Sequence, residues 1–266
     1  MEHGREKLLA HGLAQLAAHG VEIGMSTVSL ALAAEANGMS LADAEALWGA
    51  GDVDPWERYR EAVAVRVLEE QPAVGDDGSF EGTALTETLV AVSTMIEDMP
   101  DLAELSPAER GHWLRRIYRA GTDANLALAD ESLLWRSYVA IGTVALSQPS
   151  AGDALRSAWS KGHDTSTTRY LNVYSVLASM FGLRLRYAYT WPQFTTAVSA
   201  LSEGLMIRSN VREDTRSIER RSSPDGEAEQ WTLFAVCFEA LVNQFFEPDP
   251  AAEIVTDLSH EGIAQE

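Results

Sequence analysis

Histidines are the first side chains to consider for chemistry, because an imidazole can bind a metal or transfer a proton near neutral pH. His3, His11 and His19 recur at intervals of eight residues. Eight steps along a helix rotate the side chain by about 80°, so these imidazoles do not share a face and are expected to meet solvent. His112 and His163 have acidic neighbours in the sequence but no nucleophile beside them. The histidines therefore indicate neither a metal site nor acid–base catalysis.

The single cysteine and the short motifs give the same result. Cys237 stands among apolar residues of an expected helix, which indicates a buried, inert thiol. One cysteine excludes an intrachain disulfide framework and a cysteine-rich metal site. The sequence has no Gly-rich phosphate loop, no Gly-x-Ser-x-Gly elbow and no His-Glu-x-x-His motif. We expect neither enzymatic activity nor a cofactor.

Charge is the unusual property of this chain. Its 266 residues suit one large domain or two small ones, and 40 acidic against 20 basic residues give a formal net charge of −20. Such a surface repels nucleic-acid phosphates and anionic membranes over long range, although a local basic patch can act differently. The N-terminus lacks the apolar core of a signal peptide, and the uncharged stretches contain polar residues and proline. We expect a cytoplasmic protein without a membrane span.

Apolar residues recur at intervals of three and four positions along almost the whole sequence, which predicts an all-α protein. In the first 70 residues, a helix should end at Gly20, and a second should begin at Ser26 or Thr27. Ser40 should cap a short third helix that ends at Trp48. Asp54-Pro55 should open a fourth helix, which runs to about Gln71.

The remaining residues divide at a Gly- and Asp-containing stretch. We predict a helix-turn-helix domain at 1–70, a linker at 71–82, a helical domain at 83–247 and an acidic, disordered tail at 248–266. The stretch 210–226 should be a polar, Arg-rich loop. Helices are expected at about 83–98, 107–121, 125–147, 152–182, 191–209 and 227–247.

Two short helices joined by a Gly-containing turn, after a longer helix, are the helix-turn-helix arrangement. Ala33, Ala34 and Gly38 would let the two helices cross closely, and Leu30 and Leu47 would fill the space between them. A plain helical bundle is the alternative interpretation of this segment.

At this level of pattern the chain resembles the tetracycline-repressor-like (TetR/AcrR) family of bacterial regulators. The resemblance continues in Thr190-Trp191-Pro192-Gln193-Phe194 and Glu203-Gly204-Leu205, which look like a late helix of that family. The residues that match its N-terminal pattern are Arg5–Gly20, Ser26-Thr27-Val28, Ala33–Ser40, Leu41–Trp48 and Pro55–Tyr59.

The resemblance implies a homodimeric regulator in which a small apolar or aromatic ligand of the C-terminal domain modulates binding of the N-terminal heads to a DNA operator. The ligand would act by shifting the equilibrium between two conformations that bind it with different affinities. The positions that would meet DNA are Ser26, Thr27, Ser40, Leu41, Asp43, Glu45 and Trp48.

The N-terminal charges depart from the family pattern. Asp43 and Glu45 stand where Thr and Tyr are usual, and no Lys or Arg lies between Lys7 and Arg58. Residues 1–70 contain twelve acidic and five basic residues, which gives −7. Because DNA affinity rests largely on basic side chains at phosphates, we hypothesise that ordinary DNA binding is weak or absent.

Two features could still permit DNA binding. Asp43 or Glu45 could accept a hydrogen bond from cytosine N4 in the major groove. Basic side chains could also come from one downstream helix, or could instead pair with the surplus carboxylates. The arginines of that helix are Arg110, Arg115, Arg116 and Arg119.

The C-terminal domain offers aromatic candidates for a ligand pocket and apolar candidates for a dimer interface. Aromatics at helical spacing also suit an ordinary core, and the apolar faces could be buried within one chain. The pocket candidates are Trp113, Tyr138, Tyr170 and Tyr174. The dimer candidates are Leu171, Leu177, Phe181, Phe234, Phe238, Leu241 and Phe245.

The sequence thus favours a TetR-like transcription regulator with a weakened DNA-binding module. The alternative is a TetR-like dimer that no longer binds DNA and acts through a protein partner or as a ligand sensor.

Overall fold

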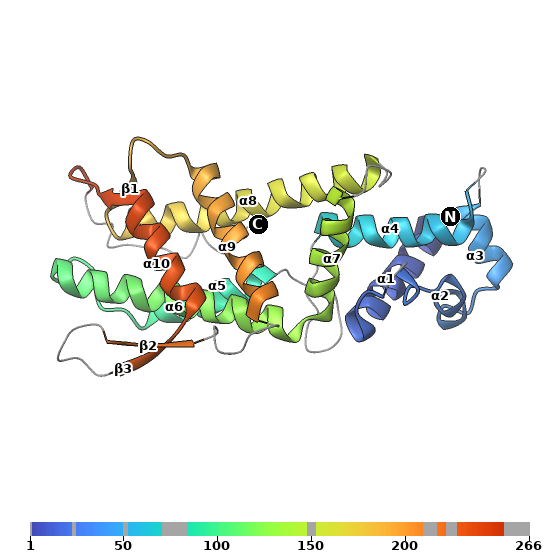
Figure 1. Ribbon diagram of the computed structural model, residues 1–266, viewed down its shortest axis with the longest axis horizontal. Helices are drawn as coiled ribbons and strands as arrows, with labels where there is room; N and C mark the ends of the chain where they lie inside the picture. Colours follow the sequence, from blue (N-terminus) through green and yellow to red (C-terminus); the bar gives the residue numbers. More distant parts are fainter. Residues whose placement is uncertain are drawn as a thin grey trace. The chain divides into compact units, whose positions relative to one another are not determined.

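The computed structural model describes residues 2–22, 25–49, 53–70, 84–147, 153–209, 217–221 and 228–252. The linker predicted at 71–82 and the tail from residue 253 lie outside the described residues. Helices dominate the described part, which confirms the helical prediction, and four short strands accompany them (Figure 1). The helices are α1 Glu2–His19, α2 Leu30–Ala36, α3 Leu41–Trp48, α4 Pro55–Glu70, α5 Ala84–Glu97, α6 Pro107–Glu131, α7 Leu133–Ser147, α8 Asp153–Met180, α9 Trp191–Ser209 and α10 Leu233–Phe245. The strands are β1 Leu183–Leu185, β2 Ser217–Arg221, β3 Ala228–Thr232 and β4 Phe246–Pro248.

The described helices fall into two compact units. The first contains Met1–Ala84 and Glu131–Thr165, and the second contains Leu85–Asp130 and Ser166–Glu266. This division differs from the predicted boundary near residue 71, because α7 packs against α1 and α4 and therefore joins the first unit.

Helix ends in the first unit follow local chemistry. Gly20, at a φ of +71°, ends α1 as predicted, since a left-handed backbone is least costly for glycine. The second helix begins later than predicted: Ser29 is its N-cap and accepts a hydrogen bond from the Leu32 amide. Ser26 and Thr27 are not caps, because both hydroxyls are bonded to Glu22 instead.

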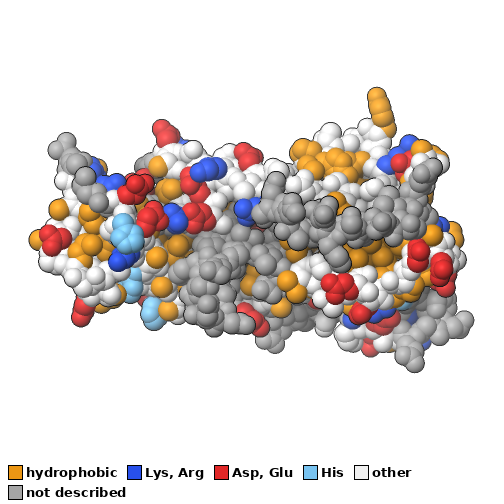
Figure 2. Space-filling model, turned by 180° about the vertical axis from the view of Figure 1, so that it is seen from behind, with side chains coloured by type: hydrophobic (Ala, Val, Ile, Leu, Met, Phe, Trp, Pro, Cys, Tyr) orange, Lys and Arg blue, Asp and Glu red, His pale blue; other side chains and the backbone are white. Residues whose placement is uncertain are grey.

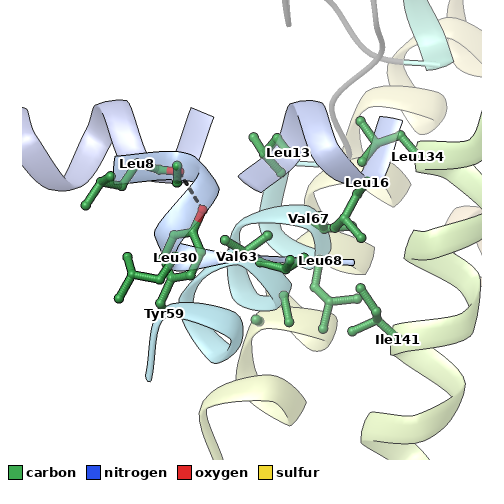
Figure 3. Packing of buried hydrophobic residues seen from close by; sticks show 14 of the residues in the cluster. Leu8, Leu13, Leu16, Leu30, Tyr59, Val63, Val67, Leu68, Leu134 and Ile141 are labelled. Atoms are coloured by element: carbon green, nitrogen blue, oxygen red, sulfur yellow. Dashed lines mark hydrogen bonds between the residues drawn. The ribbon is translucent and has the colours of Figure 1, made fainter. Parts of the chain in front are cut away.

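The core of the first unit forms where α1, α4 and α7 meet (Figure 3). Leu8 and Leu16 of α1 are fully buried against the α4 residues Val63 and Val67. The Tyr59 hydroxyl of α4 donates a 2.8 Å hydrogen bond to the Leu8 carbonyl, the dashed line in Figure 3. This bond satisfies a buried phenol, and burial raises the pKa of Tyr59.

Gly142 of α7 marks a close approach within the first unit. Trp159 stacks on Tyr138 with ring centroids 4.9 Å apart, and a Cβ at Gly142 would overlap the Trp159 ring. We expect Gly142→Ala to destabilise the protein by about 1–3 kcal/mol, because the ring must leave a filled core. Gly204→Ala is the matched control: beyond its own helical turn, no atom of the described residues lies within 4 Å of its Cβ position, so it should stabilise α9 by about 0.5–1 kcal/mol. Urea titration of both variants measures the difference.

The second unit contains α5, α6, α9, α10 and the later part of α8. The helix break predicted between 121 and 125 is wrong, because α6 continues to Glu131 and Ser132 caps the start of α7 by accepting from the Trp135 amide at 3.1 Å. The helix predicted at 227–247 is also shorter than expected. Its first residues form β3, and its last residues form β4, which pairs antiparallel with β1.

The β2–β3 hairpin replaces part of the predicted polar loop. Its Trp231 ring lies 5.4 Å from the Arg119 guanidinium and 4.8 Å from that of Arg220. Arg119 also donates to the Gln230 carbonyl at 2.6 Å and pairs with Glu229 at 3.0 Å. Residues 228–232 pair antiparallel with β2, and the contacts of Arg119 attach this strand to α6.

Candidate functional site

Helices α2 and α3 form a compact pair in the first unit, with their ends fixed by side chains. The turn between them contains Gly38 at a φ of +64°, a conformation that glycine adopts at least cost. Ser40 is the N-cap of α3, as predicted: its hydroxyl accepts from the Asp43 amide at 3.1 Å and donates to the Asp43 carboxylate at 2.6 Å. The predicted DNA-contacting residues Ser40 and Asp43 are therefore bonded to each other.

The other predicted DNA-contacting hydroxyls are bonded in a similar way. Ser26 donates to the Glu22 carboxylate at 2.6 Å, and Thr27 accepts from the Glu22 amide at 3.2 Å. Both residues lie in the segment before α2, and their hydrogen bonds to Glu22 join the two ends of that segment.

Trp48 is a core residue and not a surface residue of the α2–α3 pair. It is 7% exposed and packs edge-on against Tyr59, with ring centroids 5.6 Å apart. Its ring fills the space between α3 and α4, so Trp48 contributes little to the exposed surface that was predicted to meet DNA. Glu45 is half-buried, and its carboxylate accepts a 3.1 Å hydrogen bond from the Trp56 indole of α4.

Two arginines reach the C-terminal end of α3. Arg5 lies 5.1 Å above the Trp48 ring and donates to the Leu47 carbonyl at 2.9 Å. Arg58 donates to the Trp48 carbonyl at 3.2 Å. The end of a helix carries partial negative charge, so these guanidiniums neutralise the helix terminus.

The exposed residues of α3 are apolar or acidic. Leu41, Ala42, Asp43 and Ala46 are exposed, and none of their side chains can donate a hydrogen bond at neutral pH. On the face shown in Figure 2, Lys and Arg side chains are scattered among carboxylates, with no continuous basic surface over the described residues. The exposed side chains of α3 itself therefore supply none of the cations that neutralise phosphates, and the nearby guanidiniums of Arg5 and Arg58 are bonded to the end of the helix.

A polar cluster lies inside the second unit between α5, α6, α8 and α9. The Asn125 amide donates to the Tyr170 hydroxyl and to Thr88, both at 3.4 Å. The Ser202 hydroxyl donates to the Asn125 carbonyl oxygen at 3.0 Å and lies 3.6 Å from the Met206 sulfur. Sequence reasoning identified Tyr170 but missed the other polar residues. Asn125 is 77 positions from Ser202 and 45 positions from Tyr170 in the sequence, and contacts over such separations leave no local pattern.

Aromatic rings continue this cluster along α8. Tyr170 stacks on Tyr174 with centroids 5.9 Å apart, and Tyr174 meets Phe194 edge-on at 5.2 Å. Burial raises the pKa of Tyr170 to about 12 and that of Tyr174 well above its usual value, so both phenols stay neutral. Thr167 lies on the same face of α8, and its buried hydroxyl has no hydrogen-bond partner among the described residues.

The other two pocket candidates lie elsewhere. Tyr138 belongs to the first unit, where it stacks on Trp159. Trp113 packs near Phe181 and holds the Arg116 guanidinium 4.2 Å from its ring. The structure therefore brings together only Tyr170 and Tyr174 of the four.

The dimer candidates divide into two groups. Phe181, Phe234 and Phe238 are buried within their own chain, which agrees with the alternative that these apolar faces pack inside one protomer. Their rings fill clusters that close the second unit. The remaining candidates are half-buried: Leu171, Leu177, Leu241 and Phe245.

The predicted arginine cluster lies on α6 in the second unit. Arg119 pairs with Glu229 and lies 3.7 Å from Asp123, which agrees with the interpretation that these cations meet surplus carboxylates. The remaining members of the cluster are also α6 residues, and one of them, Arg116, lies over the Trp113 ring: Arg110, Arg115 and Arg116.

Glu203 of α9 is a carboxyl group of this unit whose burial affects the stability of the fold. Burial raises its pKa, so the folded protein binds this proton more readily than the unfolded chain does. The ionised form at pH 7 therefore opposes folding, and this cost disappears as the pH falls through the raised pKa. We expect Glu203→Gln to raise the melting temperature by a few degrees at pH 7 but not near pH 4. Exposed Glu97→Gln, melted in parallel, should change little at either pH.

Among the described residues, no group of three or more His, Cys, Asp or Glu side chains could hold a metal ion. No described helix has the length and apolar character that a membrane crossing requires. Comparisons with family models, curated proteins and solved structures find no match for this chain.

Proposed function

We propose that the chain is a TetR-like, ligand-responsive regulator whose helix-turn-helix module has weak affinity for DNA. The observation that carries this proposal is the capped α2–α3 pair, joined by residues 37–40 and packed with α1 and α4. Two short helices with a Gly-containing turn are the arrangement by which such modules enter a DNA groove.

The charge of the module sets its low affinity. No Lys or Arg lies between Lys7 and Arg58, and Arg58 is engaged with the end of α3. A basic side chain that contacts a phosphate releases a counterion from the DNA, and this release supplies most of the free energy of non-specific binding. Each missing contact therefore lowers the affinity. We expect the module to bind DNA more weakly than about 10 μM at physiological salt, toward the weak end of non-specific binding.

A gel-shift assay tests the DNA half of this proposal. Duplexes from the protein's own upstream region and scrambled duplexes of equal length should shift at similar, high protein concentrations. Nanomolar binding to the upstream duplex, with at least 100-fold preference over the scrambled one, would contradict weak DNA binding.

The second unit is the proposed ligand-binding part. Tyr170 and Tyr174 supply aromatic faces. The long hydrogen bonds of Asn125 and the Thr167 hydroxyl, which has no partner in the described part of the chain, leave polar capacity for a ligand. Because both phenols are neutral, the cluster suits an uncharged aromatic molecule with one hydroxyl or carbonyl group. Homodimerisation is part of this proposal, with half-buried Leu241 and Phe245 as its apolar contacts.

Titration with 2-naphthol, a neutral aromatic probe with one hydroxyl, tests the ligand half. We expect saturable binding that stabilises the native protein and weakens about tenfold in Asn125→Leu, since one hydrogen-bonded group is worth roughly 1.5 kcal/mol. Tyr138→Phe, in the first unit, is the control and should bind like the native protein. Binding that is equal in all three proteins would contradict the proposed location.

A further inference from the structure

Glu203 of α9 is a half-buried carboxyl group to which the described residues supply no cation and no hydrogen-bond donor. Asp123, another carboxyl of this unit whose pKa burial raises, accepts from the Thr232 hydroxyl at 2.8 Å and lies 3.7 Å from Arg119. For Glu203, burial raises the pKa and no such contact lowers it. A half-buried carboxylate gains from a positive partner, and Glu203 is the one of these two groups that could take its partner from a ligand.

The position of Glu203 on α9 places it beside the proposed ligand site. Ser202, the preceding residue, donates to the Asn125 amide oxygen at 3.0 Å and lies 3.6 Å from the Met206 sulfur. Glu203 is three positions before Met206, so the two side chains are about 60° apart around the helix and are neighbours on its surface. Helix α9 therefore presents a carboxyl group at the edge of the polar cluster that contains Asn125 and Tyr170.

We propose that Glu203 gives this ligand site a preference for aromatic molecules that carry a protonated amine. The ammonium group of such a ligand donates hydrogen bonds to the Glu203 carboxylate, and its ring lies against Tyr170 and Tyr174. The formal net charge of −20 favours the same class of ligand, because it raises the local concentration of cations. The inference rests on the proposed ligand site, and it adds a preference for positive charge to the aromatic ring and polar group proposed above.

Two naphthols of nearly equal size test this preference. 6-(Aminomethyl)-2-naphthol carries an ammonium group at neutral pH, and 6-(hydroxymethyl)-2-naphthol carries an uncharged hydroxyl at the same position. In calorimetric titrations of the full-length protein, the amine should bind about tenfold more tightly than the alcohol, because a hydrogen bond between two charged groups is stronger than one to a neutral group.

Glu203→Gln should reduce this affinity ratio from about ten to about one, because an amide side chain cannot form the ion pair. Glu97→Gln is the matched control: Glu97 is exposed on α5 of the same unit, so the variant removes an equal charge and should keep the ratio at about ten. The comparison separates a contact at Glu203 from the overall charge of the protein.

The outcomes distinguish this inference from the proposed function. If 2-naphthol binds but the amine and the alcohol bind the native protein equally, the inference is overturned and the ligand site stands. The inference is also overturned if the preference for the amine survives in Glu203→Gln or disappears in Glu97→Gln. If neither 2-naphthol nor the two new probes bind, the ligand site itself is overturned, and the inference with it.

Discussion

Phe194→Ala should lower the free energy of unfolding by about 3–5 kcal/mol, a large effect for one side chain. Phe194 is 1% exposed and lies at the centre of an aromatic cluster. Its ring lies 4.9 Å from Phe246, 5.2 Å from Tyr174 and 5.4 Å from Phe245. Alanine removes the buried area and all of these ring contacts, and a cavity remains because the neighbours come from three different elements.

Guanidinium titration followed by near-ultraviolet circular dichroism measures this loss. Tyr187→Ala is the control, because Tyr187 is fully exposed and should change stability by less than about 0.5 kcal/mol. A loss below about 1 kcal/mol for Phe194→Ala would mean that the second unit does not pack around this ring.

The triple variant Glu35→Arg/Asp43→Arg/Ala46→Arg should bind DNA about 100-fold more tightly than the native protein at 0.15 M salt. All three positions are exposed on α2 and α3. Each new arginine–phosphate contact releases roughly one counterion, which is worth about fivefold at this salt concentration. The added charge therefore converts a repulsive surface into an attractive one without changing the core.

The control places the same types of substitution on exposed positions of the second unit: Glu97→Arg, Asp98→Arg and Ala200→Arg. It changes the net charge equally, so it separates local contact from overall charge. If both triple variants gained the same affinity, the α2–α3 pair would have no special role in approaching DNA.

Sequence reasoning predicted those helices whose ends depend on nearby residues. Ser40 and Asp43 lie three residues apart, and their cap fixes the start of α3. The start of α2 was missed because Ser26 and Thr27 bind Glu22, which left Ser29 as the cap. Before α2 the sequence offers three hydroxyls, and only the three-dimensional partners decide which one caps the helix, whereas Ser40 is the one hydroxyl directly before α3.

Features that depend on distant partners could not be predicted. Residues 228–232 continue an apolar helical pattern, but Arg119 holds Trp231 and the backbone of Gln230 from α6. The bond between Asn125 and Ser202 joins two helices in the same way. Tertiary contacts of this kind override local propensity, and a single sequence carries no record of them.

The central claim is that the α2–α3 module has the wrong charge to hold DNA. The salt dependence of native DNA binding measures this directly, because the slope of log K against log salt counts the phosphates that a protein neutralises. Anisotropy titrations between 50 and 200 mM salt should give a slope between 0 and about −2, with weak affinity throughout. A slope near −5 or steeper, together with nanomolar affinity at 150 mM salt, would contradict the claim.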